Sequence, residues 1–290
     1  MKEESYSYSL WNNQSVCTWT VIIELKHLTF GFVPEKQILK DLSLSLEEKK
    51  IYALMGGNGA GKTTLFNLIT GFMKPQNGEI LFEGKNLTHQ QPYTINRQGI
   101  GRTFQDLRLI TKLTVKENII LAMQHNPTDN WLHAMLPGQF YRSANKQLGQ
   151  IADDITKEYY LNDVKNSLAG EISYGQQKLL TLACCVANGA KLLLLDEAVA
   201  GIQPEYRNKI AKLILTLKQQ GKTILLIEHN TDFIADVADT IFFLHEGTLS
   251  TFETMDALRQ DKQVMAAYLW ECYAESWKPV NRLWQKAGAF

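Results

Sequence analysis

The architecture of this chain follows from one glycine-rich segment, Gly56-Gly57-Asn58-Gly59-Ala60-Gly61-Lys62-Thr63-Thr64. The segment fits G-x-x-x-x-G-K-[ST], the pattern of a phosphate-binding P-loop. Residues 51–55 before it are apolar and predict a buried strand. Residues 65–72 after it carry apolar side chains at the i, i+3, i+4 and i+7 positions of an amphipathic helix. This order of strand, loop and helix favours a P-loop over a glycine-rich turn that only caps a helix.

The expected chemistry of the loop follows from its backbone. Glycines let successive N–H groups point inward, and the start of the following helix adds the positive end of its dipole. The Lys62 amine has the reach to contact the β- and γ-phosphates, and the Thr63 hydroxyl is a ligand for Mg²⁺. We therefore expect the chain to bind a nucleoside triphosphate.

Composition narrows the class of protein. The chain has 290 residues, of which 45% are hydrophobic and 21% charged, as expected for a globular protein with a sizeable core. Its formal net charge is zero, so no overall field favours nucleic acid as a partner. The four cysteines show no C-x-x-C spacing, which argues against a zinc site or a disulfide framework.

Neither a membrane span nor a secretion signal is expected. The sequence has no uninterrupted apolar run of the ~18 residues that a spanning helix needs. Residues 1–20 lack the apolar centre of a signal peptide and predict a loose N-terminal tail. We expect a soluble protein that reaches a membrane only through partners.

The first part of the chain predicts strands at 21–30, 38–46 and 78–82, with a turn at 30–34 between the first two. Thr114 and Glu117 form a capping box that starts a helix ending near Met123. Residues 125–145 contain prolines and glycine and predict an irregular insert, and helix resumes over 144–160. Ser173 and Gln176 form a second capping box.

The second part predicts a parallel α/β core. The apolar strand 192–195 ends at Asp196-Glu197, and the apolar strand 223–227 ends at Glu228-His229. A helix from Pro204 to about Gly221 connects them. Because ligands bind at the carboxyl ends of parallel strands, we expect Asp196, Glu197 and His229 to lie beside the P-loop. The helical region of about 106–185 interrupts this core.

The order of these motifs resembles the ATPase subunit of ABC transporters. The P-loop is followed by Gln105, by Ser-Tyr-Gly-Gln-Gln at 173–177, by four leucines and Asp-Glu at 192–197, and by Ile-Glu-His at 227–229. Within this family, Gly-Arg-Thr-Phe-Gln at 101–105, Tyr-Gly-Gln-Gln at 174–177 and Ile-Glu-His-Asn at 227–230 are similar to the ATPases of branched-chain amino acid and urea importers.

The resemblance covers roughly residues 21–270, which it implies are the ABC ATPase domain. It implies an α/β fold with a P-loop NTPase core, a mainly parallel sheet with flanking helices. An N-terminal antiparallel β subdomain and an inserted helical subdomain at about 106–185 complete that domain. Residues 1–20 are then a tail and residues 271–290 a C-terminal extension, whose amphipathic packing on the parent domain is favoured over a partner contact.

The resemblance also assigns roles to single residues. Thr63, Asp196 and Gln105 would bind or sense Mg²⁺, Glu197 would orient or deprotonate the attacking water, and His229 would contact the γ-phosphate. The bound nucleotide is ATP. By itself an Asp-Glu pair, a histidine or a glutamine is usually a structural or surface residue, but here each follows a predicted strand or a family motif.

Two further sets of residues are implied. Phe32 is the favoured stacking platform for adenine, with Phe30 as the competitor, although an aromatic side chain in this turn is equally compatible with the core. Ser173, Gly175 and Gln176 would complete the ATP site of a second subunit, with two ATP molecules held between two copies. Taken alone, Ser-x-x-Gln indicates only a helix cap.

The sequence departs from the family pattern at several positions. Tyr174 stands where many transporters have glycine, and Ala198 stands where proline usually follows the catalytic glutamate. Ile202-Gln203 replaces the usual Leu-Asn or Leu-Asp. These changes retain the chemical groups but raise the alternative of a regulatory ATP-binding subunit with low turnover.

We therefore expect an ATPase subunit that powers import of a branched-chain amino acid, urea or a similar small polar solute. It would pair with itself or with a sister ATPase beneath membrane permease subunits, on the cytoplasmic face of the inner membrane, with a solute-binding protein as an indirect partner. Residues 105–110 would contact the permease. A second alternative is an ABC ATPase of another membrane complex, such as lipopolysaccharide export.

Overall fold

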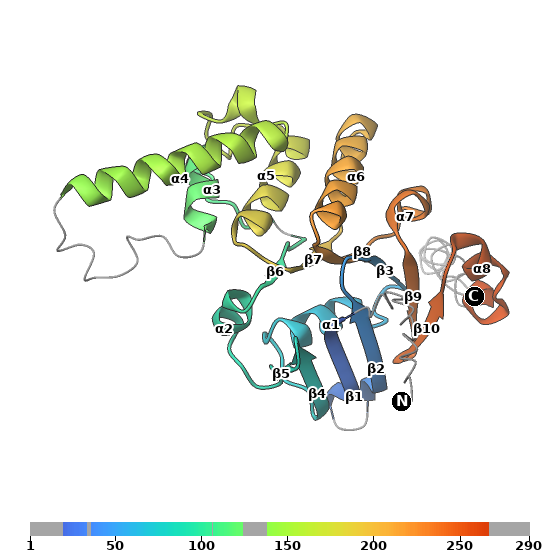
Figure 1. The fold of residues 1–290 in the computed structure, drawn as a ribbon. Helices are drawn as coiled ribbons and strands as arrows, with labels where there is room; N and C mark the ends of the chain where they lie inside the picture. The colour runs from blue at the N-terminus through green and yellow to red at the C-terminus, as the bar shows by residue number, and fades with distance from the viewer. Residues whose placement is uncertain (1–19, 34–35, 106, 124–137, 267–290) are drawn as a thin grey trace, which may run out of the picture.

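The computed structural model describes residues 20–33, 36–105, 107–123 and 138–266 (Figure 1). Its first sheet is four-stranded and antiparallel, with the order β2-β1-β4-β5. The strands are β1 (Val21–Val33), β2 (Lys36–Glu47), β4 (Asn77–Phe82) and β5 (Lys85–Asn86). The predicted N-terminal antiparallel subdomain is therefore confirmed.

The turn predicted at 30–34 is wrong in its extent, because β1 continues to Val33 and pairs there with Lys36. Close approach of the two backbones at Gly31 explains the difference. A Cβ atom at Gly31 would lie 2.5 Å from the Lys36 carbonyl oxygen, so the absence of a side chain allows pairing to continue where the sequence suggested a turn.

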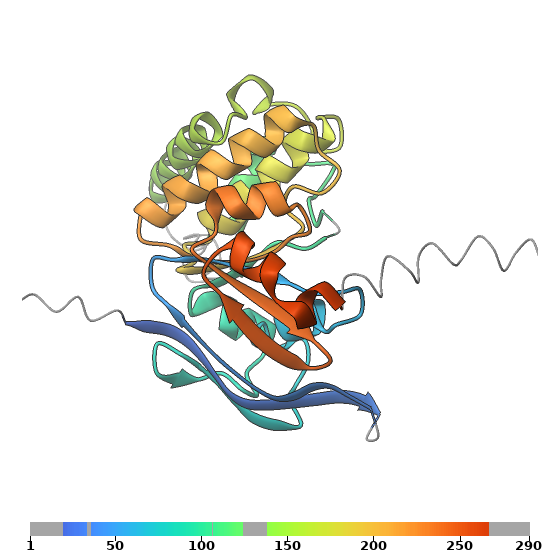
Figure 2. The ribbon, with the colours of Figure 1, turned by 90° about the vertical axis from the view of Figure 1, so that its right-hand side faces the viewer.

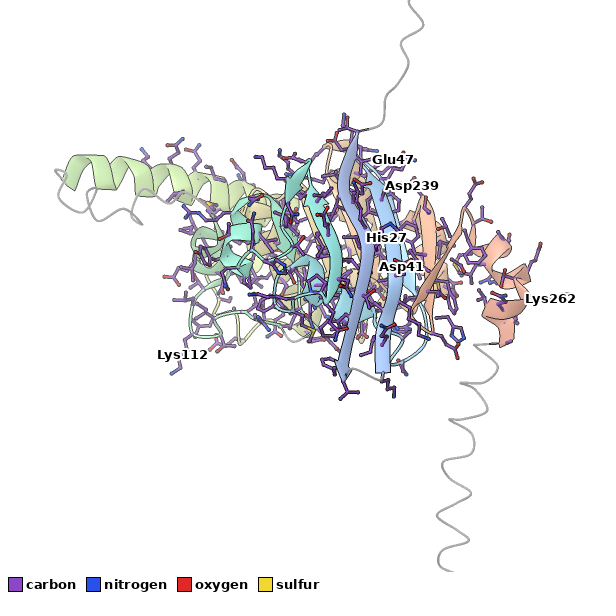
Figure 3. All side chains as sticks on the ribbon, turned by 90° about the horizontal axis from the view of Figure 1, so that it is seen from below. His27, Asp41, Glu47, Lys112, Asp239 and Lys262 are labelled. Carbon is purple, nitrogen blue, oxygen red and sulfur yellow. The ribbon has the colours of Figure 1, made fainter. Side chains whose placement is uncertain are left out.

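The pair β1 and β2 is distorted near its middle. His27 and Asp41 both have positive φ, at 52° and 53°, and the register shifts on either side of Leu28. The His27 Nδ1 and Asp41 Oδ1 atoms lie 2.7 Å apart on the exposed face of this sheet (Figure 3). Since both side chains are largely exposed, we expect this contact to contribute little to stability.

The second sheet has six strands in the order β10-β9-β3-β8-β7-β6. Its neighbours are parallel except for β10, which runs antiparallel to β9 at the edge. The strands are β3 (Ile51–Met55), β6 (Ile100–Arg102), β7 (Leu192–Asp196), β8 (Thr223–Ile227), β9 (Thr240–His245) and β10 (Thr248–Phe252). Every residue of β3, β7 and β8 is buried, as expected for parallel strands covered on both faces.

Helix α1 (Lys62–Ile69) lies between the two sheets (Figure 2). Its apolar side chains Leu65, Phe66, Leu68 and Ile69 belong to one buried cluster with side chains of β1, β2 and β4 and with Tyr52 and Leu54 of β3. The parallel sheet is thus joined to the antiparallel sheet through the helix that follows the P-loop.

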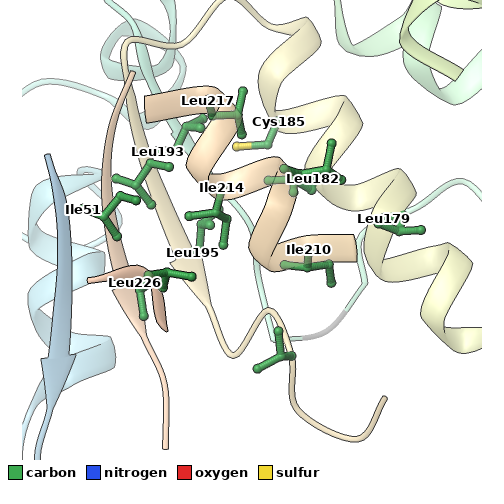
Figure 4. Packing of buried hydrophobic residues seen from close by; sticks show 14 of the residues in the cluster. Ile51, Leu179, Leu182, Cys185, Leu193, Leu195, Ile210, Ile214, Leu217 and Leu226 are labelled. Carbon is green, nitrogen blue, oxygen red and sulfur yellow. The ribbon is translucent and has the colours of Figure 1, made fainter. Parts of the chain in front are cut away.

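The opposite face of the six-stranded sheet is covered by α5 (Tyr174–Ala187), α6 (Pro204–Gln219), α7 (Thr231–Val237) and α8 (Met255–Gln260). In Figure 4, Ile210, Ile214 and Leu217 of α6 face the leucines of β7 and Leu226 of β8. Within α5, Cys185 is buried in the same cluster, and burial raises the pKa of its thiol to about 12.

The helical insert comprises α3 (Val115–Ala122), α4 (Gly138–Glu158), the 3₁₀ helix η3 (Asn162–Val164) and α5, and it projects to one side (Figure 1). Both predicted capping boxes are present, at Thr114 and Glu117 and at Ser173 and Gln176. The short helix α2 (Pro92–Arg97) precedes β6. These elements confirm the predicted fold class.

The predicted irregular segment 125–145 is wrong at its end, because α4 already begins at Gly138. A glycine destabilises a helix chiefly in its interior, and here it occupies the first position. Residues 124–137 lie outside the described part of the chain, as do the tail before residue 20 and the extension after 266. None of the helices in the described ranges is both long enough and apolar enough to cross a lipid bilayer.

Candidate functional site

The P-loop joins β3 to α1 and has the backbone that glycines permit. Gly56 and Gly61 have φ values of 145° and 107°. A Cβ atom at Gly56 would lie 2.2 Å from the Leu244 carbonyl oxygen, and one at Gly61 would lie 2.8 Å from the Ile38 Cγ2 atom. The loop is therefore held closely between β9 and β2, with its N–H groups at the start of α1.

The Lys62 amine closes the loop on itself. Its Nζ atom donates to the carbonyl oxygens of Gly56 and Gly57, at 2.6 and 2.8 Å. The Lys62 residue is only 8% exposed, whereas the neighbouring Thr63 is exposed. The positive charge is thus held at the loop, as the predicted role in phosphate binding requires.

A cavity of about 520 Å³ lies beside the P-loop. It is lined by residues 57–60 of the loop, by Lys36 and Lys40 of β2, and by the turn 245–247 after β9. Two lysines and the loop N–H groups favour an anionic ligand. The sequence did not reveal that β2 and the turn after β9 line this cavity, because both are separated from the loop along the chain.

Asp196, at the end of β7, is held by a buried arginine. The Arg102 Nη2 and Asp196 Oδ2 atoms lie 3.2 Å apart, and the two side chains are 5% and 6% exposed. Arg102 also donates to the Asn67 Oδ1 atom at 2.7 Å, and its guanidinium group lies over the rings of Phe66 and Phe104. Burial lowers the pKa of Arg102, and the Asp196 carboxylate opposes this effect.

Glu197 and His229 are brought together, as predicted from the ends of neighbouring strands. Their Oε1 and Nε2 atoms lie 3.9 Å apart, and both side chains are partly exposed. Glu197 has a left-handed backbone with φ of 50°. Its N–H donates to the Ile227 carbonyl at 3.0 Å, and its carbonyl accepts from the buried Lys178 amine at 2.9 Å. These bonds hold an otherwise unfavourable backbone in place.

Behind this pair lies a second buried carboxyl group. Glu228 is 2% exposed, and its Oε1 atom accepts from the Val199 N–H at 2.8 Å. Burial raises the pKa of Glu228 to about 7, against the opposing effect of backbone N–H donors and of Lys178. Glu228 therefore connects the segment after Glu197 with the strand end that carries His229.

Gln105 has an exposed side chain and directly follows residues 101–104, which line a groove. A cavity of about 330 Å³ runs between residues 101–104, residues 108–110 and the helical insert. Phe104 contacts the Phe72 ring edge-on, and the Arg108 guanidinium lies 3.5 Å from the Phe104 ring centre. The groove thus combines aromatic, aliphatic and cationic groups.

Ser173, Gly175 and Gln176 lie at the start of α5. The Ser173 Oγ atom accepts from the Gln176 N–H at 3.3 Å, and the Gln176 Oε1 atom accepts from the Ser173 N–H at 2.9 Å. This helix packs on the face of the six-stranded sheet opposite α1. The structure therefore places these residues across the sheet from the P-loop helix of the same chain.

The two aromatic candidates for adenine differ in exposure. Phe32 is 66% exposed and Phe30 only 9%, and their rings meet edge-to-face with centres 5.3 Å apart. Phe32 is thus the accessible ring, while Phe30 belongs to the core between the sheets. The choice of Phe32 as the stacking platform remains a prediction.

Residues 39–200 match the family model of the ABC transporter. The chain belongs to this family. Over 251 residues it is 32% identical to the "High-affinity branched-chain amino acid transport ATP-binding protein BraF" of Pseudomonas aeruginosa, covering 86% of this chain and 98% of that protein. It is 34% identical over 234 residues to the "High-affinity branched-chain amino acid transport ATP-binding protein LivG" of Salmonella typhimurium, covering 80% of this chain and 92% of that protein.

Solved structures agree with this membership. The nucleotide-free ATP-binding cassette of an ABC transporter superposes with a TM-score of 0.73 at 28% identity, covering 86% of this chain and 99% of that one. The protein is thus an ABC transporter ATPase, a subunit that binds ATP and works with the membrane subunits of a transporter. The predicted family is confirmed.

Several residues of this ABC ATPase site were absent from the sequence-based prediction. They are the partners of predicted residues: Arg102 for Asp196, Lys178 for Glu197, and Tyr206, whose hydroxyl lies 3.3 Å from the Ser173 Oγ atom. Arg102 had a visible signal, since it lies within the motif 101–105. Lys178 and Tyr206 had none, because each reaches its partner from another helix.

Proposed function

We propose that this ABC ATPase powers import of a branched-chain amino acid, urea or a similar small polar solute. The relatives described above are named as branched-chain amino acid transport proteins, and the motifs at 101–105, 174–177 and 227–230 support the same class. We assign the ATPase domain to residues 21–270, with the insert at about 106–185, and treat 1–20 and 271–290 as additions to it.

The observation that carries the mechanism is the separation of the site into two halves. The P-loop, Asp196, Glu197 and His229 gather at one edge of the sheet, whereas Ser173 lies on the helix layer of the opposite face. One chain then supplies only half of the groups around ATP. A second copy or a sister ATPase, turned head to tail, would supply Ser173, Gly175 and Gln176.

The proposed metal is Mg²⁺, held by Thr63, Asp196 and Gln105 together with the phosphates. Hydroxyl, carboxylate and amide oxygens suit this cation, which keeps several non-protein ligands. Within the described residues, no cluster of three or more His, Cys, Asp or Glu side chains competes as a metal site. When bound, the ion would neutralise charge on the β- and γ-phosphates.

The residues of the chain supply the remaining chemistry. Lys62 offsets phosphate charge at the loop, and Glu197 orients or deprotonates the attacking water. His229, whose Nε2 atom lies 3.9 Å from the Glu197 Oε1 atom, would contact the γ-phosphate. No covalent intermediate is needed, because positioning and charge neutralisation carry most of the catalysis of phosphoryl transfer.

We further propose that the permease subunits contact the groove beside residues 105–110. Its lining mixes Phe104, Leu109 and Ile110 with Arg108, which suits an amphipathic segment of a partner. With the permease bound at this groove, the ATPase would lie at the periphery of the inner membrane on its cytoplasmic side. A solute-binding protein would contact only the permease, and nucleic acid is not proposed as a partner.

The test of the hydrolytic role is Glu197→Gln, which preserves the size of the side chain. Phosphate release should fall by at least about a hundredfold, while affinity for Mg²⁺–ATP is retained. Glu79→Gln, at an exposed acid of β4 outside the cavity beside the P-loop, is the control and should hydrolyse ATP normally. Retained hydrolysis by the Glu197 variant would remove this residue from its proposed role.

The test of import is uptake of labelled leucine and of labelled urea by cells with and without the gene. Loss of one of these activities would identify the solute, and unchanged uptake of both would contradict this solute class. An envelope defect would instead support the alternative of lipopolysaccharide export. Phosphate release that stays negligible even with the permease present would support the low-turnover alternative, which Ala198 and Gln203 motivate.

A further inference from the structure

Tyr206, in the first turn of α6, packs directly on the start of α5. A Cβ atom at Gly175 would lie 2.5 Å from the Cγ and Cδ2 atoms of the Tyr206 ring. The ring therefore occupies the space that any larger residue at position 175 would need. Glycine at position 175 therefore leaves room for the Tyr206 ring, in addition to any room that a phosphate at the start of α5 would need.

The position of the Tyr206 ring is also fixed by contacts within the first turns of α6. The Lys209 amine lies 5.0 Å from the centre of the Tyr206 ring, and it forms an ion pair with Glu205 at 2.6 Å. The Tyr206 N–H donates to the Gln203 carbonyl at 3.0 Å. The position of the ring is thus linked to residues 196–203, which contain the proposed catalytic glutamate.

The Ser173 hydroxyl donates to the Tyr206 hydroxyl oxygen at 3.3 Å, and rotation of the two hydroxyl protons reverses this bond without moving a heavy atom. A serine hydroxyl has one proton and two acceptor sites. The Gln176 N–H uses one acceptor site. If the Tyr206 hydroxyl uses the other, the Ser173 proton is directed away from both neighbours and is available to an incoming phosphate oxygen.

We propose that Tyr206 is a positioning residue, which orients the Ser173 hydroxyl toward the γ-phosphate of the ATP bound to the other subunit. This inference rests on the proposed function, because Ser173 meets a phosphate only in the closed dimer. It adds a group that acts through Ser173 and touches no nucleotide itself. Through the first turn of α6, Tyr206 also connects Ser173 with the segment of the same chain that follows Glu197.

The experiment measures ATP-driven dimerisation of the full chain in the Glu197→Gln background, by sedimentation with Mg²⁺–ATP. Tyr206→Phe keeps the ring against Gly175 and removes only the hydroxyl. Loss of one hydrogen bond at each of two sites should weaken the dimer by roughly tenfold. Tyr160→Phe is the matched control, since Tyr160 also contacts Lys209, with 5.5 Å between the amine and the ring centre.

A double-mutant cycle with Ser173→Ala separates positioning from general packing. If Tyr206 acts through the Ser173 hydroxyl, adding Tyr206→Phe to Ser173→Ala should weaken the dimer no further. Additive losses, an unchanged dimer or a tighter dimer with Tyr206→Phe would overturn the proposal. If the parent Glu197→Gln chain does not dimerise with ATP at all, the two-subunit site itself is wrong, which is a different result from failure of Tyr206 alone.

Discussion

The two proposed halves of the ATP site are built differently. Around the P-loop, the charged side chains of Lys62, Arg102, Asp196 and Glu228 are almost completely buried, and each pairs with a neighbouring side chain or backbone group. At the start of α5, Ser173 and Tyr174 are exposed, and one serine hydroxyl makes the contacts that hold the turn. Changes in the first half should therefore reduce folding stability, whereas changes in the second should mainly reduce assembly.

The largest expected effect is that of Arg102→Ala. Removing the guanidinium group leaves the Asp196 carboxylate buried without its ion pair, which costs about 3–5 kcal/mol of unfolding free energy. Urea unfolding measures this loss. Arg108→Ala removes an exposed arginine that contacts the same Phe104 ring and should cost less than about 1 kcal/mol. Equal losses for the two variants would contradict the contrast between the halves.

The next effect is that of Gly56→Ala, which tests whether backbone approach shapes the loop. The added Cβ atom would meet the Leu244 carbonyl oxygen of β9, so we expect a loss of about 3 kcal/mol together with weaker ATP binding. Gly149→Ala in α4 is the control, because this glycine lies outside the loop and has no positive φ, and the nearest atom to the added Cβ would be the Lys116 Nζ atom at 3.7 Å. A nucleotide titration in which both variants bind ATP alike would contradict this account.

A smaller effect concerns pH and Glu228. Its pKa is raised from 4.5 to about 7, so between these values the folded chain holds a proton that the unfolded chain has lost. Stability should therefore decrease as pH rises through this window, by up to roughly 3 kcal/mol. Glu228→Gln keeps an acceptor for the Val199 N–H and should flatten this part of the pH profile. An unchanged slope in the variant would assign the dependence to another group.

The smallest expected effect on stability is that of Ser173→Ala. Loss of this helix cap costs about 1 kcal/mol. Thr114→Ala, which removes the equivalent cap of α3, should cost a similar amount. The two variants should differ in assembly, because only the Ser173 variant is expected to weaken ATP-driven dimerisation. If both variants dimerise like the parent, Ser173 serves only as a cap.

Much of the fold was predictable because its patterns are local. The buried strands at 192–196 and 223–227 appear as apolar runs, and the two capping boxes appear as Thr or Ser three residues before Glu or Gln. The predicted end of β1 was wrong because pairing with β2 overrode the turn-forming residues. The start of α4 was missed because a glycine at the first helical position resembles a helix breaker.

In the candidate site, too, the local features could be predicted and the long-range contacts could not. The P-loop and the polar ends of β7 and β8 could be predicted, because parallel strands bring their carboxyl ends to one edge. The side chains that hold these groups could not. Lys178 reaches Glu197 from α5, and two lysines reach the cavity beside the P-loop from β2, with no motif to mark them.

The sequence alone was enough to predict the family, the glycine loop and the groups proposed to act on ATP. Each of these depends on backbone geometry within a few residues. The contacts that orient those groups arise only when distant parts of the chain fold together. Arg102 and Asp196 are 94 positions apart, and Ser173 and Tyr206 are 33 positions apart. Burial makes such pairings energetically important, and burial is a property of the packed chain.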